Sequence, residues 1–276
     1  MSNLKILYNN VADSATISAS TTAGSLAASN LLTDIKSDVW RSTSTSATLT
    51  LTWAASQLLS GVVLPFCNLT STATFRIKVY TNVADASPVV DTGAVLACAN
   101  SPLGLWSWGS VPLGVNAYSY GGASYGVGWF TPTSCKKITI EIVDTSNPSG
   151  YIEASRVVTG SVFTPENDAE LNVDFWIDDR SVEARSGGGD LRMDIGTSSK
   201  GIKFNLSNMN PSDRLTVASI LKGNGKYKPL YVSLFPSDAD PAKEQQYQIY
   251  GKLSGSLSIG HSNWNLFGCP VEIVEN

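Results

Sequence analysis

Hydrophobic and polar residues alternate with a period of two in several short stretches of this chain. ATLTLTW at 47–53 places two leucines and a tryptophan on one face and threonines on the other. ATFRIKVYTN at 73–82 and KKITIEIVD at 136–144 repeat the pattern. A period of two is typical of a strand with one buried face, and several such strands at this spacing predict a β-sandwich.

Other stretches complete this N-terminal part. GVVLPFC at 61–67 is a continuous apolar run, which predicts a strand covered on both faces. GYIEASRVVTGSVFTP at 150–165 predicts one or two closing strands, and Pro165 with the polar ENDAE that follows marks a boundary. We therefore expect a first domain at 1–164 and a second at 165–276.

The second domain is also predicted to be mostly β. In ELNVDFWIDDRSVEARS, Val173, Phe175 and Ile177 alternate with polar residues and Trp176, which predicts one long half-buried strand. LRMDIGTSSKGIKFNLSNM predicts two more strands, and further strands are expected at 228–236, 245–255 and 264–275. This arrangement favours a β-sandwich or barrel module.

One short helix is predicted near 211–222. Asn210 suits the N-cap, Pro211 the first helical position and Asp213 the first turn, while Gly223 suits the C-cap. The predicted apolar stripe, which would lie against a sheet, consists of Leu215, Ala218, Ile220 and Leu221.

Charge and composition exclude several classes of function. The net charge is −4 and no run of Lys or Arg occurs, so nucleic-acid-specific binding and attraction to an anionic membrane surface are not expected. No stretch approaches the ~18 apolar residues of a membrane span, so membrane insertion is not expected either. The first residues lack the apolar core of a signal peptide, which indicates synthesis in a cytoplasm.

Candidate catalytic and metal-binding groups are few. The four cysteines, widely spaced beside a single histidine, predict buried free thiols and no zinc site. A serine hydrolase would need His261 as its base, but no nucleophile motif accompanies it. Carboxylate pairs such as Asp174 and Asp178 are explained by the solvent face of a strand. We therefore expect no enzyme and no cofactor.

The most unusual composition lies at 101–130, where three Trp and three Tyr are interspersed with seven Gly. Long irregular loops of this kind usually serve function, and large rings on a flexible backbone suit contact surfaces. They could stack on sugar rings or form a protein–protein contact. The candidate contact residues in this loop are Trp106, Trp108, Tyr118, Tyr120, Tyr125 and Trp129.

The segment SNLLTDIKSDVWRS at 29–42 has two competing interpretations. Leu31, Leu32, Ile35 and Trp40 have apolar spacing suited to closing one end of a sandwich, and this interpretation is favoured. Arg41 is then expected to pair with an acidic group or with backbone carbonyls at the rim. A contact role for Arg41 stays open.

Three of these segments together resemble a known family. SNLLTDIKSDVWRS, FRIKVY and YIEASRVVTG resemble the galactose-binding-like (discoidin-type) β-sandwich of tailed-phage virion proteins. FNLSNMNPSDRLTVASILKGNGKYKPLYVSLFPSD, with YQIYGKLSG and the closing strand, is similar to the ring-forming module of phage distal tail proteins.

The resemblance implies a structural protein of the phage distal tail or baseplate. Such a protein would assemble with itself into a threefold or sixfold ring, contact other tail proteins, and connect the tail tube to the tip or fibres. It would reside in the virion. The alternative is a carbohydrate-binding module without catalysis, which could contact a glycan of the host surface.

Overall fold

The computed structural model describes residues 4–98, 124–170, 172–236, 241–255, 258–263 and 265–276. It is mostly β, as the sequence predicts, and it divides into two compact units. The first unit takes the chain up to Pro165 together with Leu230–Gln248, and the second takes Glu166–Pro229 with Ile249–Asn276. The division into domains at 1–164 and 165–276 stays a prediction, but the first unit clearly includes a later stretch of chain.

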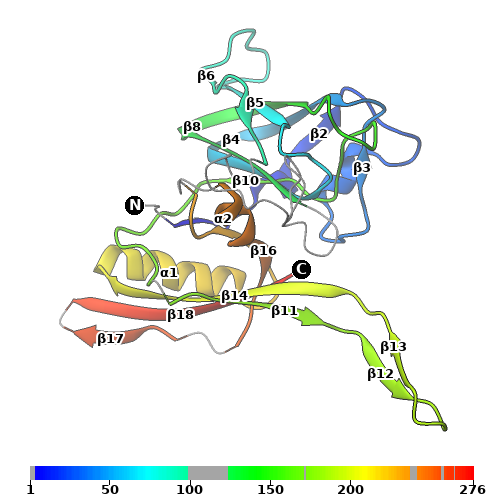
Figure 1. The fold of residues 1–276 in the computed structure, drawn as a ribbon. Helices are drawn as coiled ribbons and strands as arrows, with labels where there is room; N and C mark the ends of the chain where they lie inside the picture. Colours follow the sequence, from blue (N-terminus) through cyan, green and yellow to red (C-terminus); the bar gives the residue numbers. More distant parts are fainter. Residues whose placement is uncertain (1–3, 99–123, 171, 237–240, 256–257, 264) are drawn as a thin grey trace. The chain divides into compact units, whose positions relative to one another are not determined.

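The first unit is built on one large antiparallel sheet (Figure 1). Its path is β3-β9-β4-β8-β5-β6, with β2 and β10 paired to β4 and β7 paired to β5. The strands of this sheet are β2 (Thr16–Ala19), β3 (Trp40–Arg41), β4 (Ser46–Cys67), β5 (Thr74–Tyr80), β6 (Val90–Asp91), β7 (Val95–Leu96), β8 (Ser124–Val143), β9 (Glu153–Ala154) and β10 (Val158–Gly160).

Two long strands shape this unit. β4 and β8 pair along most of their length, and the ladder shifts register at three places, between Thr52 and Gln57, Leu59 and Gly61, and Leu64 and Cys67. Such irregularities bend a strand, so one continuous pair can curve around a core. Residues 47–53 of β4 alternate between buried and half-buried, while residues 59–67 are buried throughout. Both features confirm the predicted patterns.

The core of the first unit contains the predicted apolar faces. Leu49, Leu51 and Trp53 of β4 are buried, as are Phe75 and Ile77 of β5. Smaller elements complete the unit: η1 (Val11–Ser14), η2 (Ala28–Leu32), the paired strands β1 (Lys5–Leu7) and β15 (Leu230–Ser233), and α2 (Pro241–Gln246).

The prediction of an irregular loop over 101–130 is wrong for residues 124–130. Residues 124–130 are the first part of β8 and pair with β4, for example Gly61 with Trp129. Glycine is favoured at 126 and 128 because side chains of β5 occupy the space where a Cβ would lie, 2.6 Å from Phe75 and 2.5 Å from Ile77. The sequence hides this strand because glycine carries no hydrophobic signal.

The second unit has its own antiparallel ladder and one longer helix. Within it the ladder runs β16-β18-β14-β11, and β17 pairs with β18. Its elements are β11 (Asp174–Asp179), β12 (Val182–Arg185), β13 (Leu191–Asp194), β14 (Ser198–Met209), α1 (Pro211–Asn224), β16 (Gln248–Leu253), β17 (Gly260–Asn263) and β18 (Leu266–Glu275).

The predicted helix is confirmed, but two of its details are wrong. The side chain of Asn210 accepts a hydrogen bond from the backbone N–H of Asp213 at 2.7 Å, as an N-cap should. The buried side chains are Asp213, Val217, Ile220 and Asn224, whereas Leu215 is 63% exposed. The helix also extends one residue past Gly223, and its C-cap is Gly225 at φ 50°.

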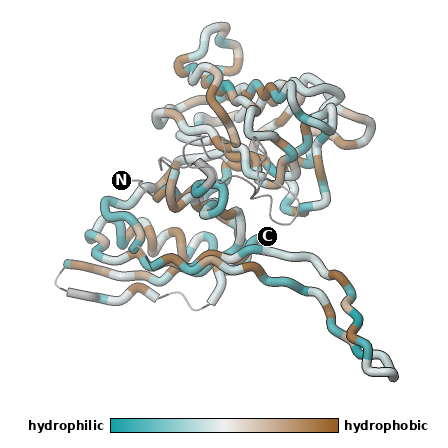
Figure 2. Tube along the Cα trace, in the orientation of Figure 1, coloured by the Kyte–Doolittle hydropathy of each residue, from teal (hydrophilic) through white to brown (hydrophobic). Residues whose placement is uncertain are grey.

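The strand predicted at 172–178 is present, but its pattern of buried and exposed side chains differs from the prediction. Trp176, expected to point outward, is half-buried because its ring covers Gly201, where a Cβ would lie 2.2 Å from the indole. Ile177 is exposed, contrary to the prediction. Beyond β11, β12 and β13 form a two-stranded ribbon that extends away from α1, β14 and β18 (Figure 1). Figure 2 colours several positions along this ribbon as hydrophobic.

Candidate functional site

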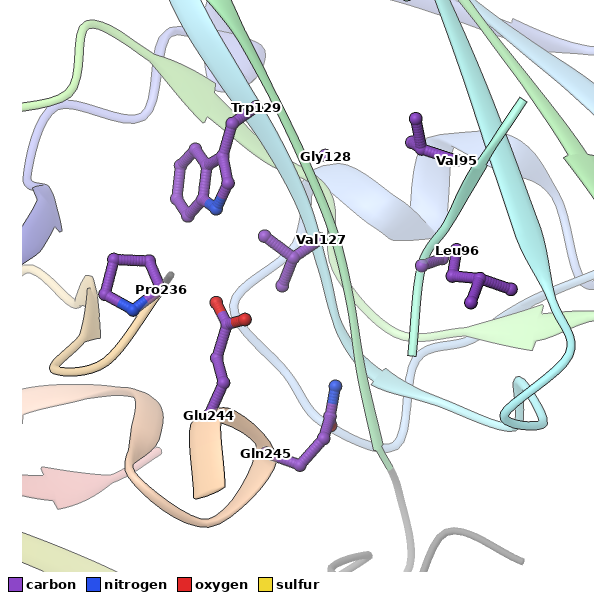
Figure 3. Close-up of a pocket in the computed structure, with 9 residues that line it drawn as sticks. Val95, Leu96, Val127, Gly128, Trp129, Pro236, Glu244 and Gln245 are labelled. Carbon is purple, nitrogen blue, oxygen red and sulfur yellow. The ribbon is translucent and has the colours of Figure 1, made fainter. Parts of the chain in front are cut away.

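A small cavity lies in the first unit, where β7 and β8 face α2 (Figure 3). Its volume is about 260 Å³, slightly below the ~300–1,000 Å³ of typical small-molecule pockets. The wall is mainly apolar, with two polar side chains from α2. The lining residues are Val95, Leu96, Ala97, Val127, Gly128, Trp129, Pro236, Glu244 and Gln245.

Trp129 is placed by the β4–β8 ladder. It pairs with Gly61, and a Cβ on that glycine would lie 2.4 Å from the indole ring, so the ring can pack flat on the neighbouring strand. The ammonium of Lys5 lies 4.4 Å from the centre of the indole, and the ring of Tyr231 lies 6.1 Å away. These contacts fix the indole at the edge of the cavity as a rigid amphipathic wall.

Glu244 brings a carboxylate to the same space. In Figure 3 its carboxyl group points from α2 toward Val127 and Trp129. One oxygen accepts a hydrogen bond from the Ser233 hydroxyl at 3.0 Å. Burial raises the pKa of Glu244 to about 7, although the Ser233 hydrogen bond and the nearby Lys5 ammonium act in the opposite direction.

Gln245, the next residue of α2, is 5% exposed. Its Nε2 donates a hydrogen bond to the backbone oxygen of Tyr125 at 3.2 Å. Among the described residues, its Oε1 is buried and receives no hydrogen bond. A buried acceptor without a donor is costly, so this oxygen lowers the stability of the local packing.

The arrangement suits binding of a small polar molecule. It combines apolar walls from Val127, Trp129 and Pro236 with the Glu244 carboxyl group, whose oxygens accept hydrogen bonds. No group of three or more His, Cys, Asp or Glu side chains in the described part of the chain is placed to hold a metal ion. The chemistry that these residues support is hydrogen bonding to hydroxyl groups beside an apolar surface.

The residues predicted to form one contact surface do not lie together in the described structure. Trp106, Trp108, Tyr118 and Tyr120 lie outside the described residues. Tyr125 is 1% exposed, and its ring packs 5.7 Å from Phe66 and 6.2 Å from Tyr231, so a surface role for this side chain is wrong. Trp129 lines the cavity.

Arg41 is engaged elsewhere in the first unit. Its Nε donates to Glu153 at 2.7 Å, and its guanidinium lies 4.3 Å from the centre of the Tyr151 ring. The expected pairing with an acidic group is therefore confirmed. In the same segment Leu31 and Trp40 are fully buried, which agrees with a closing role. Ile35 is 56% exposed and does not belong to that buried set.

Sequence reasoning missed both polar residues of the cavity. Strands are expected at 228–236 and 245–255 with no helix between them, whereas Pro241–Gln246 forms α2, which carries Glu244 and Gln245. The available signal was Asp-Pro followed by a glutamate, which is typical of a helix start. No residue pattern could show that this helix would face β8, more than a hundred positions earlier.

All four cysteines are free and buried, as predicted. Within the described ranges, no helix combines the length and the apolar character that crossing a membrane requires.

Comparisons with known proteins find no match in sequence and several partial matches in structure. No family model matches the chain, and no curated protein matches it. A chitosan-binding module of a chitosanase/glucanase from Paenibacillus sp. IK-5 aligns with 15% identity and a TM-score of 0.38, over 55% of this chain and 99% of that module. A Clostridium perfringens module in complex with GalNAc-β-1,3-galactose aligns with 9% identity and a TM-score of 0.38, over 56% and 99%.

A third structure is the family 32 carbohydrate-binding module of a C. perfringens protein in complex with galactose. It aligns with 9% identity and a TM-score of 0.37, over 58% of this chain and 99% of that module. These scores are low. The fold of the first unit is therefore described from its strand pairing and from its cluster of buried side chains. These show a curved β-sheet packed around one core.

Proposed function

We propose that the first unit binds a small carbohydrate without catalysis, at the cavity between β8 and α2. The observation that carries the proposal is the combination of the Trp129 wall with the Glu244 carboxyl group, a hydrogen-bond acceptor that points into the same cavity. A sugar presents hydroxyl donors beside apolar C–H groups, so it complements both parts of this surface. The volume of about 260 Å³ suits one sugar ring at the end of a longer glycan.

Titration of the full chain with galactose, fucose, glucosamine and short host-surface glycans tests this proposal. Glu244→Gln keeps the shape of the side chain and removes its charge. The titration is run at pH 8.5, above the pKa of about 7, so that Glu244 is ionised in the wild type. We expect the variant to bind about tenfold more weakly, because a hydrogen bond to a charged group contributes roughly 1.5–3 kcal/mol and one to a neutral amide oxygen about 0.5–1.5 kcal/mol. Glu272→Gln, in the second unit, is the matched control and should bind as the wild type does.

Two results would contradict the proposal. One is the absence of binding to every glycan of the panel. The other is a sugar that binds equally to the wild type and to Glu244→Gln, which would place the binding site elsewhere.

A second candidate function is structural. The chain would be a virion protein of a tailed phage, located in the distal tail or baseplate and joined to itself in a threefold or sixfold ring. The resemblance of SNLLTDIKSDVWRS and of the C-terminal module to such proteins supports it, as does the exposed β12–β13 ribbon, which suits assembly. The two candidates are compatible, since a tail protein can contact a host glycan.

Mass spectrometry of purified phage particles tests the structural role. Tail fractions should contain this chain at a fixed ratio to the tube protein. Abundance in the lysate together with absence from washed particles would refute it, and would leave the carbohydrate proposal intact.

A further inference from the structure

The ribbon formed by β12 and β13 lacks cover in the described structure. Every residue of both strands is exposed, including Val182, Leu191 and Met193, at 62%, 52% and 56%. A two-stranded ribbon is marginally stable by itself, and open strand edges with exposed apolar side chains tend to pair with other chains. The ribbon therefore has the character of a surface that an assembly would cover.

The distribution of side chains favours pairing through an edge over packing through a face. Glu183 lies opposite Met193 and Arg185 lies opposite Leu191, so these four share one face. The other face carries Val182 and Ala184 opposite Asp194 and Arg192. Each face mixes charged and apolar residues, so neither offers a continuous apolar surface.

β12 carries one negative and one positive side chain, so two antiparallel copies of this strand can place opposite charges against each other. Glu183 and Arg185 lie on the same face, two residues apart, and form an exposed ion pair in which Glu183 Oε1 lies 3.9 Å from Arg185 Nη2. Their side chains are 57% and 66% exposed. We propose that β12 pairs antiparallel with β12 of a second copy of this chain, about a two-fold axis through Ala184. In this register Glu183 of each copy lies directly opposite Arg185 of the other, which forms two cross-strand ion pairs.

The other two-fold registers centred on β12 are less favourable. A centre at Glu183 or at Arg185 places identical charges opposite one another, which is destabilising. A centre at Val182 places Glu183 opposite Ser181 and Arg185 opposite Asp179. This register is less favourable because the chain leaves the strand between Asp179 and Val182, and because the Asp179 carboxylate already accepts hydrogen bonds from the Ser181 N–H and hydroxyl. A centre at Ala184 also brings together two of the smallest side chains on the axis.

The β12 edge is favoured over the β13 edge by its continuity. β12 follows β11, the last strand of the ladder β16-β18-β14-β11, so in the described structure the β11–β12 side carries no further strand along its length. β13 continues into β14, whose other side pairs with β18 from Gly201 onward. A second copy can therefore approach β12 along an edge that stays open from Asp174 to Arg185.

The proposed contact is isologous. It joins two chains and does not by itself close a ring of three or six. It involves the second unit only, so it is independent of carbohydrate binding by the first.

Disulfide trapping of the full chain tests the register. Directly opposite residues in an antiparallel pair have Cα atoms about 4.5–5.5 Å apart, within the range of a disulfide, so Ala184→Cys should form a covalent dimer with oxidised glutathione. Val182→Cys is the matched control on the same strand and face. Its two copies would lie about 13 Å apart and should stay uncoupled. The four native thiols are buried, which limits background.

Sedimentation over a concentration series tests the ion pairs. Glu183→Arg should weaken self-association about tenfold, since it replaces two attractive pairs with two repulsive ones. Adding Arg185→Glu restores the pairs with reversed signs and should restore association. Asp194→Arg, on β13, should have little effect.

Several outcomes would overturn the proposal. These are a chain that stays monomeric at every concentration and gives no trapped dimer, equal trapping of the two cysteine variants, or loss of association with Asp194→Arg but not with Glu183→Arg.

Discussion

Replacing Glu244 with glutamine should make the stability of the first unit less dependent on pH. The wild-type carboxyl group has a pKa of about 7 in the folded chain, against an ordinary value of 4.5. Folding therefore favours its protonated form. That contribution to stability is fully present below about pH 4.5 and is lost as the pH rises through 7.

The two pKa values set the size of the effect. The gap between 4.5 and about 7 corresponds to about 3 kcal/mol of unfolding free energy, most of which falls between about pH 5 and pH 8.5. Glutamine resembles the protonated acid and can still accept the Ser233 hydrogen bond. The variant should therefore resemble the wild type near pH 5, and its advantage should grow by about 2–3 kcal/mol by pH 8.5.

Neighbouring groups titrate too, so the comparison must be made between variants. Burial lowers the pKa of Lys5 and raises that of Tyr231, and both groups face Glu244. The Glu244 charge itself raises the pKa of Lys5 and of Tyr231, so the difference between Glu244→Gln and the wild type also includes this coupling. Urea unfolding at a series of pH values, followed by tryptophan fluorescence, measures this difference.

Glu272→Gln serves as the control for the loss of one negative charge. A constant gap between Glu244→Gln and the wild type from about pH 5 to pH 8.5 would refute the reasoning. So would a variant that is less stable than the wild type at the higher pH.

Two further predictions concern packing and capping. Trp40→Ala should destabilise the first unit by about 3–5 kcal/mol in urea unfolding, because the ring is fully buried and its Nε1 donates to the Thr21 backbone oxygen at 3.1 Å. Ile35→Ala, an exposed neighbour in the same segment, should change stability by less than about 0.5 kcal/mol; similar losses would contradict the closing role. Asn210→Ala should cost the second unit about 1 kcal/mol in thermal unfolding through loss of the Asp213 cap, and no change would contradict that assignment.

The parts of the fold that sequence could predict are those with a local physical cause. Alternation at 47–53 marks the buried face of β4, and the cap residues mark the start of α1. The apolar spacing of the segment at 29–42 predicts that it closes one end of the sandwich, and Leu31 and Trp40 are buried as that role requires. Each of these conclusions depends on neighbours within a few residues.

The cavity depended on contacts that no local pattern contains. Trp129 was a candidate because of its composition, but its position follows from pairing with Gly61, nearly seventy residues earlier. Glu244 and Gln245 reach the same space from α2, far along the chain. Their unusual electrostatics arise from burial, and burial is a property of the folded unit. Sequence reasoning therefore found one wall of the cavity and missed its polar side.

The stretch DFWIDDRSVEAR shows why alternation alone can mislead. It predicts a half-buried strand, and a strand is present, but Ile177 and Val182 are exposed. Alternation indicates only that one face needs cover, whether that cover comes from the same chain or from another. The described part of this chain supplies no cover for the faces of β12, and pairing of two β12 edges about Ala184 would extend the sheet without burying those faces. Alternation here therefore predicts a strand correctly and a buried face incorrectly.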